Sequence, residues 1–269
     1  MNVELISSRT DAVADIKKSF RNYSLVGMLS WQDIRRRYRR SMIGPFWLTI
    51  STGVMIATMA IVFGSIFRSP IAEFLPYLAT GIILWTFIST TILEGCNAFI
   101  NADAIIKQLQ IPLFVHVLRV VWSNCIILAH NIVIIPLVFL FFLKVPNLNL
   151  LFLIPGFLLL AVNLSWIALF LGTICARYRD FPQIISSIIQ IFFYITPIIW
   201  MPHLVPHRAG TMLINMNPVY HLITIVRAPI LGEAPDLLNW AVCILLAFAG
   251  WSLTLVFYSK YKHRIPYWL

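Results

Sequence analysis

Five arginines stand close together near the start of the chain, in the segment WQDIRRRYRRSMIGPFW that spans residues 31–47. Planar guanidinium groups hold phosphate oxygens in a forked geometry, and arginine does this better than lysine. An uncharged run from Ser41 to Phe67 follows directly. Because each arginine inside hydrocarbon would cost about 2.5–3.5 kcal/mol, the cluster must stay at the membrane surface while the uncharged run enters the bilayer. The chemistry that these residues offer is the binding of phosphate groups at that surface.

The arginine segment has the periodicity of a helix that lies in the membrane interface. One face collects apolar and aromatic residues at spacings of three and four, and the opposite face is charged, which is typical of interfacial helices. Gly44-Pro45 offers a turn into the bilayer. The alternative is a positive flank that only orients the first span. The apolar face is Met28, Trp31, Ile34, Tyr38 and Met42, opposite Asp33, Arg36 and Arg40, with Arg35 and Arg39 on its flanks.

Composition indicates an all-α integral membrane protein. Of the 269 residues, 60% are hydrophobic and 11% charged, and the mean hydropathy is +0.86. The net charge of +10 is expected to set membrane orientation and not to bind nucleic acid. Four scattered cysteines without a CxxC pair predict free thiols. The polar tail to about Asn22 is expected to fray or form a short helix, and it lacks the apolar core of a cleavable signal.

Uncharged runs predict six transmembrane helices, each near the roughly 20 residues that a bilayer requires. A further apolar run, residues 209–226, is interrupted by polar residues and Pro218. Because broken backbone at membrane depth must be buried in protein or line water, we expect residues 201–236 to form a re-entrant helical hairpin at the outer face, a candidate gate. The expected spans are 43–67, between Glu73 and Glu94, between Arg119 and Lys144, within 150–173, 183–200 and 237–259; the expected units are 1–42 (cytoplasmic tail and interface helix) and 43–269 (transmembrane domain).

The distribution of Lys and Arg predicts that both termini face the cytoplasm. With six spans, sixteen of the twenty cationic residues fall on the inner side, and only Arg68, Lys144, Arg208 and Arg227 fall on the outer side. A four-to-one bias in short loops is a strong orientation signal. A seventh span would place the basic C-terminal residues opposite the basic N-terminus, so the charge distribution rejects it.

The connection after the second span predicts a short amphipathic helix over about residues 101–111. Asn101 can cap such a helix and Pro112 closes it, with Ile105, Ile106 and Leu109 on one side. A surface connector would have this pattern, and so would a docking element for a cytosolic motor.

Several segments together resemble the permease subunits of ABC-2 type polysaccharide exporters, the family that exports O-antigen and teichoic acid. WQDIRRRYRRSMIGPFW resembles the opening signature. NADAIIKQLQIP stands at the family's coupling segment, although a basic pair near Gln108 is more common there. The remaining landmarks follow in order to the end of the chain: ARYRDFPQ (176–183), NMNPVYHLITIVRAPILG (215–232) and HRIPYWL (263–269).

The resemblance implies a homodimer with six spans per copy, bound to two copies of a cytosolic ABC ATPase in the bacterial inner membrane. Its implied cargo is a polysaccharide carried on undecaprenyl diphosphate. The chain has no GxxxxGK[ST] phosphate loop, so ATP and Mg²⁺ are expected on the partner subunit. We therefore expect no cofactor, metal site or catalytic residue on this chain.

In that mechanism, arginines would hold the lipid diphosphate and aromatic faces would let a glycan slide without trapping it, although Trp and Tyr also gather at membrane interfaces for other reasons. The two irregular connections would couple the chain to the ATPase and gate the outer face. The predicted residues are Arg35, Arg39 and Arg40 for the headgroup; Phe46, Trp47, Trp85, Phe87, Phe193, Tyr194 and Trp200 for the channel; Asn101, Asp103, Ile105, Lys107 and Leu109 for coupling; and Asn217, Pro218, Tyr220 and Arg227 for the gate.

Other functions stay open or are disfavoured by the residues present. An ABC-2 permease for teichoic acid or for a small-molecule or drug cargo shares the six-span plan. A membrane enzyme acting on lipid-linked sugars would normally show paired acidic residues, and neither DxD nor HxxxxD occurs. No expected span has a carboxylate well inside its limits, which disfavours proton coupling. Asn124, His130, Asn131 and Asn163 inside spans predict helix-to-helix hydrogen bonds.

Overall fold

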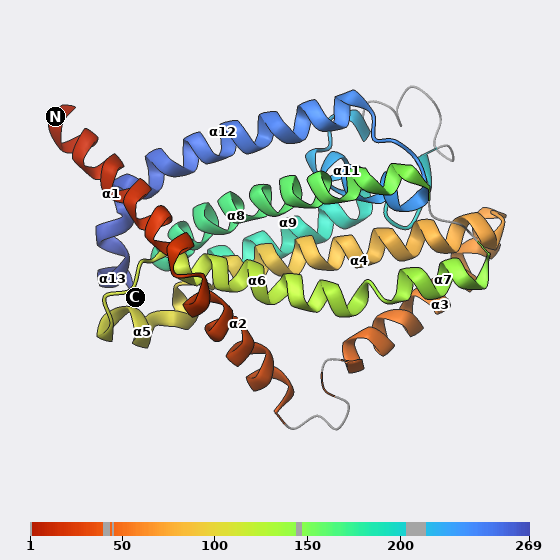
Figure 1. Ribbon diagram of the computed structural model, residues 1–269, viewed down its shortest axis with the longest axis horizontal. Helices are drawn as coiled ribbons and strands as arrows, with labels where there is room; N and C mark the ends of the chain where they lie inside the picture. Colours follow the sequence, from red (N-terminus) through yellow and green to blue (C-terminus); the bar gives the residue numbers. More distant parts are fainter. Residues whose placement is uncertain (1, 40–43, 45, 144–146, 203–213) are drawn as a thin grey trace.

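The computed structural model describes residues 2–39, 44, 46–143, 147–202 and 214–269, and within these ranges the chain is helical and has no strand. Long helices run side by side, and the first and last helices lie together at one end of the bundle (Figure 1). We call this the terminal end and the opposite one the far end. The helices are α1 (Asn2–Arg21), α2 (Tyr23–Tyr38), α3 (Phe46–Phe67), α4 (Ile71–Cys96), α5 (Asp103–Gln108), α6 (Phe114–Asn131), α7 (Ile134–Phe141), α8 (Leu153–Arg177), α9 (Phe181–Ile195), α11 (Pro218–Leu231), α12 (Leu237–Tyr261) and α13 (Ile265–Trp268), with 3-10 turns η1 (Ile100–Ala102), η2 (Leu148–Phe152) and η4 (Lys262–Arg264).

Among the described residues, five helical segments are long and apolar enough to cross a membrane. They include the first four predicted spans and the last one. The fifth predicted span corresponds to α9, which has only 15 residues because Thr196, before Pro197, is extended. Six spans and a re-entrant hairpin therefore remain predictions. The five segments are Phe46–Phe67, Ile71–Cys96, Phe114–Phe141, Leu148–Arg177 and Leu237–Trp268.

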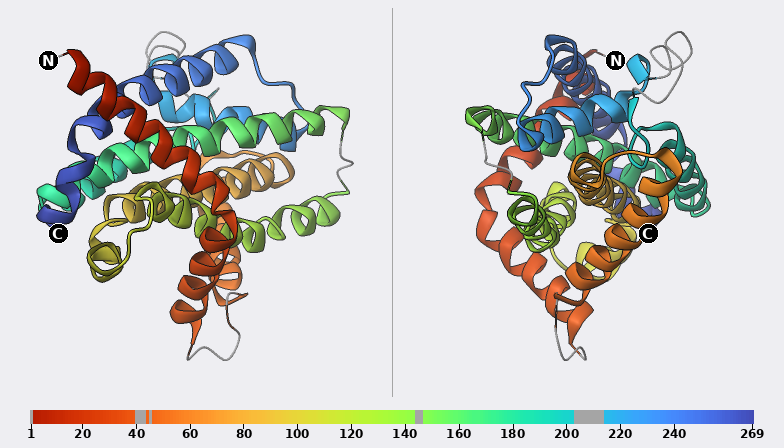
Figure 2. Two further views of the ribbon diagram at one scale, coloured as in Figure 1. Left: turned by 60° about the vertical axis from the view of Figure 1, so that its left-hand side comes forward. Right: turned by 90° about the vertical axis from the view of Figure 1, so that its right-hand side faces the viewer.

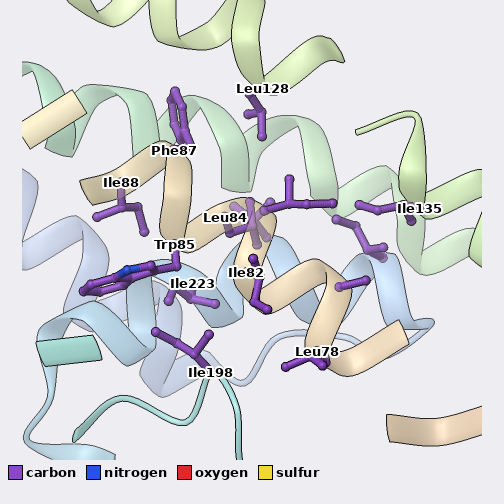
Figure 3. Close-up of a cluster of buried hydrophobic side chains, with 14 of the residues drawn as sticks. Leu78, Ile82, Leu84, Trp85, Phe87, Ile88, Leu128, Ile135, Ile198 and Ile223 are labelled. Atoms are coloured by element: carbon purple, nitrogen blue, oxygen red, sulfur yellow. The ribbon is translucent and has the colours of Figure 1, made fainter. Parts of the chain in front are cut away.

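Helix α4 runs through the centre of the bundle, where it contacts α3, α6, α8 and α11. Figure 3 shows its side chains surrounded by Leu128 of α6, Ile223 of α11 and Ile198 from the segment after α9. Gly95 lets α4 and α8 approach closely, since a Cβ there would lie 2.6 Å from the Cβ of Ala168. Helix α3, in contrast, leaves most of its apolar side chains uncovered, which suits a surface that faces lipid or another protein.

Polar side chains join neighbouring helices within the bundle. Asn163 of α8 donates to the carbonyl of Cys243 in α12 at 3.1 Å, and Thr49 of α3 donates to Asn131 of α6 at 3.3 Å. These contacts confirm the predicted helix-to-helix hydrogen bonds for both asparagines. His130 differs, because its ring nitrogen pairs with the Ile126 carbonyl of its own helix at 2.7 Å.

The expectation of a frayed or short N-terminal helix is wrong. The 20-residue α1 packs against α12 and α6, and Asp15 is only 6% exposed. Its carboxylate accepts hydrogen bonds from the backbone N–H groups of Leu113 (3.2 Å) and Phe114 (3.1 Å) and from the Tyr258 hydroxyl (2.9 Å). Lys262 Nζ lies 3.4 Å away. Asp15 thus satisfies free N–H groups at the start of α6 and joins both ends of the chain.

We predict that Asp15→Asn destabilises the terminal end, because the amide loses the charge and turns one acceptor into a donor that faces N–H groups. The loss in free energy of unfolding should be about 3 kcal/mol, as for breaking one side of a buried ionic network. Thermal unfolding in detergent measures it, and trypsin should cleave the released α1 faster. Asp11→Asn is the matched control, because Asp11 is 55% exposed. Equal unfolding of both variants would contradict the prediction.

Candidate functional site

Helix α2 has two different apolar surfaces. Val26, Ser30 and Ile34 are buried where α2 contacts α6, and α2 and α3 flank α6 (Figure 2). Met28 and Trp31 are 53% and 55% exposed, so this part of the predicted stripe remains open to a membrane. Ile34, another residue of that stripe, is buried in the protein, and Asp33, expected on the opposite charged face, is only partly exposed, whereas Arg36 is exposed.

The last turns of α2 border an open hollow of about 790 Å³, which we call the basic hollow. Arg35 and Arg39, two of the three predicted headgroup residues, line it; Arg40 lies outside the described residues. Their side chains and that of Arg36 are exposed, so three guanidinium groups on adjacent turns are available to an anion. The lining residues are Trp31, Gln32, Ile34, Arg35, Arg36, Tyr38, Arg39 and Gly44.

Two ion pairs, which sequence reasoning missed, hold α2 against the bundle. Arg119 of α6 donates from Nε and Nη2 to both carboxylate oxygens of Asp33. Arg37 Nη2 donates to Glu94 Oε1 of α4 at 2.5 Å, and Asn124 Nδ2 donates to Glu94 Oε2 at 2.8 Å. The C-terminal half of α2 is therefore tied to α4 and α6 through its charged face.

The sequence did contain a signal for this network. Glu94 is the only charged residue between Glu73 and Asp103, and the structure places it in the last turn of α4, facing α2 and α6. Burial lowers the pKa of Arg37, but the Glu94 carboxylate outweighs burial and the net pKa is raised. Burial also raises the pKa of Tyr38, although Arg37 opposes it. At neutral pH the guanidinium is charged and the phenol keeps its proton.

Four of the predicted channel aromatics meet in one cluster. The rings of Trp85 and Phe193 lie 5.6 Å apart between centroids, and those of Phe193 and Tyr194 lie 5.4 Å apart. Trp200 donates from its indole nitrogen to the Tyr194 carbonyl at 3.2 Å. Tyr194 is 65% exposed, so the cluster reaches from the core around α4 to the surface of the chain.

The other three predicted aromatics lie elsewhere. Phe87 is buried and faces Phe157 of α8, at 5.8 Å between ring centroids. Phe46 and Trp47 are exposed at the start of α3, and Phe46 contacts His130. The seven aromatics therefore do not form a single surface within one copy of the chain.

The predicted coupling segment forms a short helix at the terminal end (Figure 1), but its boundaries differ from the prediction. The N-cap is Ala102 and not Asn101, because Asn101 already belongs to the turn η1. The helix ends at Gln108, where Leu109 becomes extended, well before Pro112.

The side chains of α5 divide into an inner and an outer face. Ile106 packs against the core at the terminal end, whereas Leu109, directly after the last helical residue, is 55% exposed. Lys107 and Asp103 form an ion pair at 2.9 Å along the helix surface. Ile105 is partly exposed and Asn101 is exposed. Helix α13 contacts α5, so the C-terminal residues support this surface.

The predicted gate residues begin and anchor α11, which lies in the half of the bundle away from α5 and α13 (Figure 1). Asn217 caps the helix by accepting from the N–H groups of Val219 and Tyr220, and Pro218 occupies its first position. Asn217 also donates to the Thr196 hydroxyl at 2.8 Å. The start of α11 is thereby fixed to the end of α9.

Arg227, counted above as an outer cation, is buried inside the protein. It is only 3% exposed, and its Nη1 donates to the Pro197 carbonyl at 2.8 Å. Its guanidinium also lies 4.1 Å from the ring centroid of Tyr77. Arg227 therefore joins α11 to α4 and to the chain that follows α9. It contributes to internal packing and leaves little charge for the surface.

The family model described as "ABC-2 type transporter" matches residues 24–231. The chain belongs to the ABC-2 type transporter family. The matched residues run from α2 to the end of α11, so they hold the basic hollow, both ion pairs of α2 and the buried Arg227. Helices α1, α12 and α13 lie outside the match.

Curated relatives of this ABC-2 transporter chain match over most of their lengths. Two are named "O-antigen export system permease protein RfbA" from Klebsiella pneumoniae, with 24% identity over 249 residues and 25% over 247 residues. In both cases 90% of this chain and 93% of the relative are covered. A protein of the same name from Myxococcus xanthus is 21% identical over 218 residues, covering 79% of this chain and 82% of the relative.

We predict that Arg227→Met destabilises the far end of this ABC-2 transporter chain by about 2–3 kcal/mol. Methionine fills similar space but loses the charged hydrogen bond and the cation–π contact, and it leaves the Pro197 carbonyl unpaired. Thermal unfolding measures the change. Arg68→Met is the matched control, because Arg68 is exposed. An equal effect of the two substitutions would refute the anchoring role.

Proposed function

We propose that this chain is the channel-forming permease subunit of an ATP-driven exporter that moves polysaccharide of the O-antigen type, linked to undecaprenyl diphosphate, across the bacterial inner membrane. The observation that carries the proposal is similarity over nearly the whole chain to proteins named as O-antigen export permeases. The basic hollow supports it, because exposed guanidinium groups beside aromatic residues suit a lipid diphosphate at a membrane surface.

The terminal end is proposed to face the cytoplasm. Basic residues lie in its connections and at the end of α12, including Lys107, Arg179 and Lys260. Acidic Glu233 and Asp236 precede α12 at the far end. This asymmetry agrees with the rule that basic loops stay inside. Both termini would then be cytoplasmic.

The working assembly is proposed to contain two copies of this chain and two copies of a cytosolic ABC ATPase. ATP and Mg²⁺ belong to the ATPase, so this chain provides the path and is not itself an enzyme. The uncovered apolar surface of α3 supports a membrane or second-copy contact. Helix α5 is the proposed ATPase contact, since Leu109 is exposed while Ile106 anchors the helix.

Movement of α5 has a physical route to the headgroup site. The segment after α5 ends at Leu113 and Phe114, whose N–H groups bind Asp15 of α1. Helix α1 continues almost directly into α2, which carries the basic hollow. A push on α5 would therefore reach the arginines through α1. At the far end, α11 is proposed as the gate and the cluster around Trp85 and Tyr194 as part of the glycan path.

Placing charge on the exposed face of α5 should uncouple the permease from its ATPase. We predict that Leu109→Asp loses co-purification of the ATPase and lowers export at least about tenfold, because a carboxylate replaces an apolar contact. Leu237→Asp is the matched control, since Leu237 is also exposed but starts α12 at the far end. Unchanged export and normal co-purification of Leu109→Asp would reject α5 as the contact.

The lysine series tests the basic hollow. Replacing Arg35, Arg39 and Arg40 together by lysine keeps the charge but removes the planar fork. Export should fall about tenfold and lipid-linked glycan should accumulate inside cells, while expression and topology stay unchanged. The control is Arg21→Lys, outside the hollow. Full export by the triple variant would leave these arginines as membrane anchors only.

A further inference from the structure

A second cavity lies on the protein-facing side of α2, between α2, α4 and α6. We call it the inner polar cavity; its volume is about 330 Å³, and three arginines and two carboxylates border it. It shares only Arg36 with the basic hollow. The lining residues are Asp33, Arg36, Arg37, Glu94, Ala98, Asn101, His116, Arg119, Val120 and Ser123.

The inner polar cavity contains hydrogen-bonding capacity that the described chain does not use. His116 is 1% exposed and lines the cavity, yet neither of its ring nitrogens has a partner among the described residues. A buried imidazole without partners is costly, so such a group points to a ligand. Arg36 also makes no ion pair in the described part of the chain, which leaves the lining with an excess of positive charge.

The two ion pairs that border the cavity differ in how easily an incoming anion can replace the carboxylate. Arg119 grips Asp33 with two donors, and their side chains are 13% and 28% exposed. Arg37 holds Glu94 through one bond, and their side chains are 43% and 30% exposed. A single, more exposed pair is the weaker of the two, so Arg37 is the guanidinium that an incoming anion can take over.

We propose that the inner polar cavity binds a phosphate group. Without that ligand, the Glu94 carboxylate occupies the position on Arg37 that the phosphate would take. The phosphate would accept from Arg37, Arg36 and His116 while Glu94 turns away. Because Arg37–Glu94 joins α2 to α4, this exchange frees the last turn of α2 and leaves its anchor at Arg119 in place. Binding of phosphate and movement of the arginine-bearing turn are thus one event.

The inference rests on the proposed function for the origin of the phosphate, which a lipid-linked diphosphate or a membrane phospholipid could supply. It adds Arg37, Glu94 and His116 to the arginines of the basic hollow. It also gives Glu94 a positioning role, because Glu94 would compete with the ligand instead of binding it.

The test is calorimetric titration of pyrophosphate into the full-length chain in nanodiscs of phosphatidylcholine. Glu94→Gln should bind pyrophosphate about tenfold more tightly, because Arg37 loses its competing carboxylate. Arg37→Lys should bind about tenfold more weakly, with Arg21→Lys as the matched control. His116→Phe should also weaken binding, and it removes no hydrogen bond that the fold uses.

Binding to the basic hollow alone would not respond to Glu94 or His116. Wild-type affinity in both Glu94→Gln and His116→Phe, or weaker binding in Glu94→Gln, would overturn the proposal. If phosphatidylglycerol in the nanodisc suppresses the Glu94-sensitive binding, a phospholipid headgroup supplies the phosphate. If that binding persists, the diphosphate of the cargo is the source, and both results support the site.

Glycan export in cells separates this inference from the proposed function. If export is normal but pyrophosphate affinity is unchanged in Glu94→Gln, the exporter function stands and the phosphate site in the inner polar cavity is rejected. If pyrophosphate affinity changes in Glu94→Gln but the chain exports no glycan, the phosphate site stands and the exporter function is rejected.

Discussion

The cost of an unpaired charge away from water constrains this structure more than any other factor. The buried ionic groups of the described chain are paired with groups from distant segments: Asp15 with the start of α6 and the end of α12, and Arg227 with Pro197 and Tyr77. The partly buried Arg119 is paired with Asp33. These pairings are obligatory, because a charge left alone would cost several kcal/mol. These directional contacts fix the positions of the helices relative to one another. Apolar packing alone is non-directional and would let the helices slide.

The pairs differ in burial, and that difference divides the molecule into firm and movable parts. Arg227 is enclosed and Asp15 is enclosed, so α11 and α1 are held firmly at opposite ends. The pair Arg37–Glu94 is partly open to solvent, so an anion from solution can compete with Glu94 for the Arg37 guanidinium. The segment most easily released is therefore the last turn of α2, which is also the segment that carries the exposed arginines. In the proposed export of a lipid-linked glycan, this position would let the last turn of α2 respond to an anionic headgroup.

Sequence reasoning succeeded where one segment determines its own structure. Uncharged runs predicted the long spans, because hydrocarbon excludes charge locally. It failed where the structure of a segment depends on a contact with a residue far away in the sequence. Asp15 and Tyr258 are 243 residues apart, so nothing near Asp15 could show that the tail would become a docked helix. The prediction that Asn101 caps α5 failed for a local reason, because Asn101 lies within the 3-10 turn η1, where its backbone does not have the conformation of a cap.

The aromatic residues show why a site of this kind resists prediction from a list of residue types. Trp85 and Phe87 are two positions apart on α4, so they point to opposite sides of the helix. One joins Phe193 and Tyr194, and the other enters the contact with α8. Hydropathy and composition treat the two residues alike, since both are aromatic and both lie in an apolar span. Only the neighbour on each side of α4 distinguishes the two rings. Arg227 fixes α11 and the chain after α9 against α4, whereas the close approach at Gly95 places α8 on the other side.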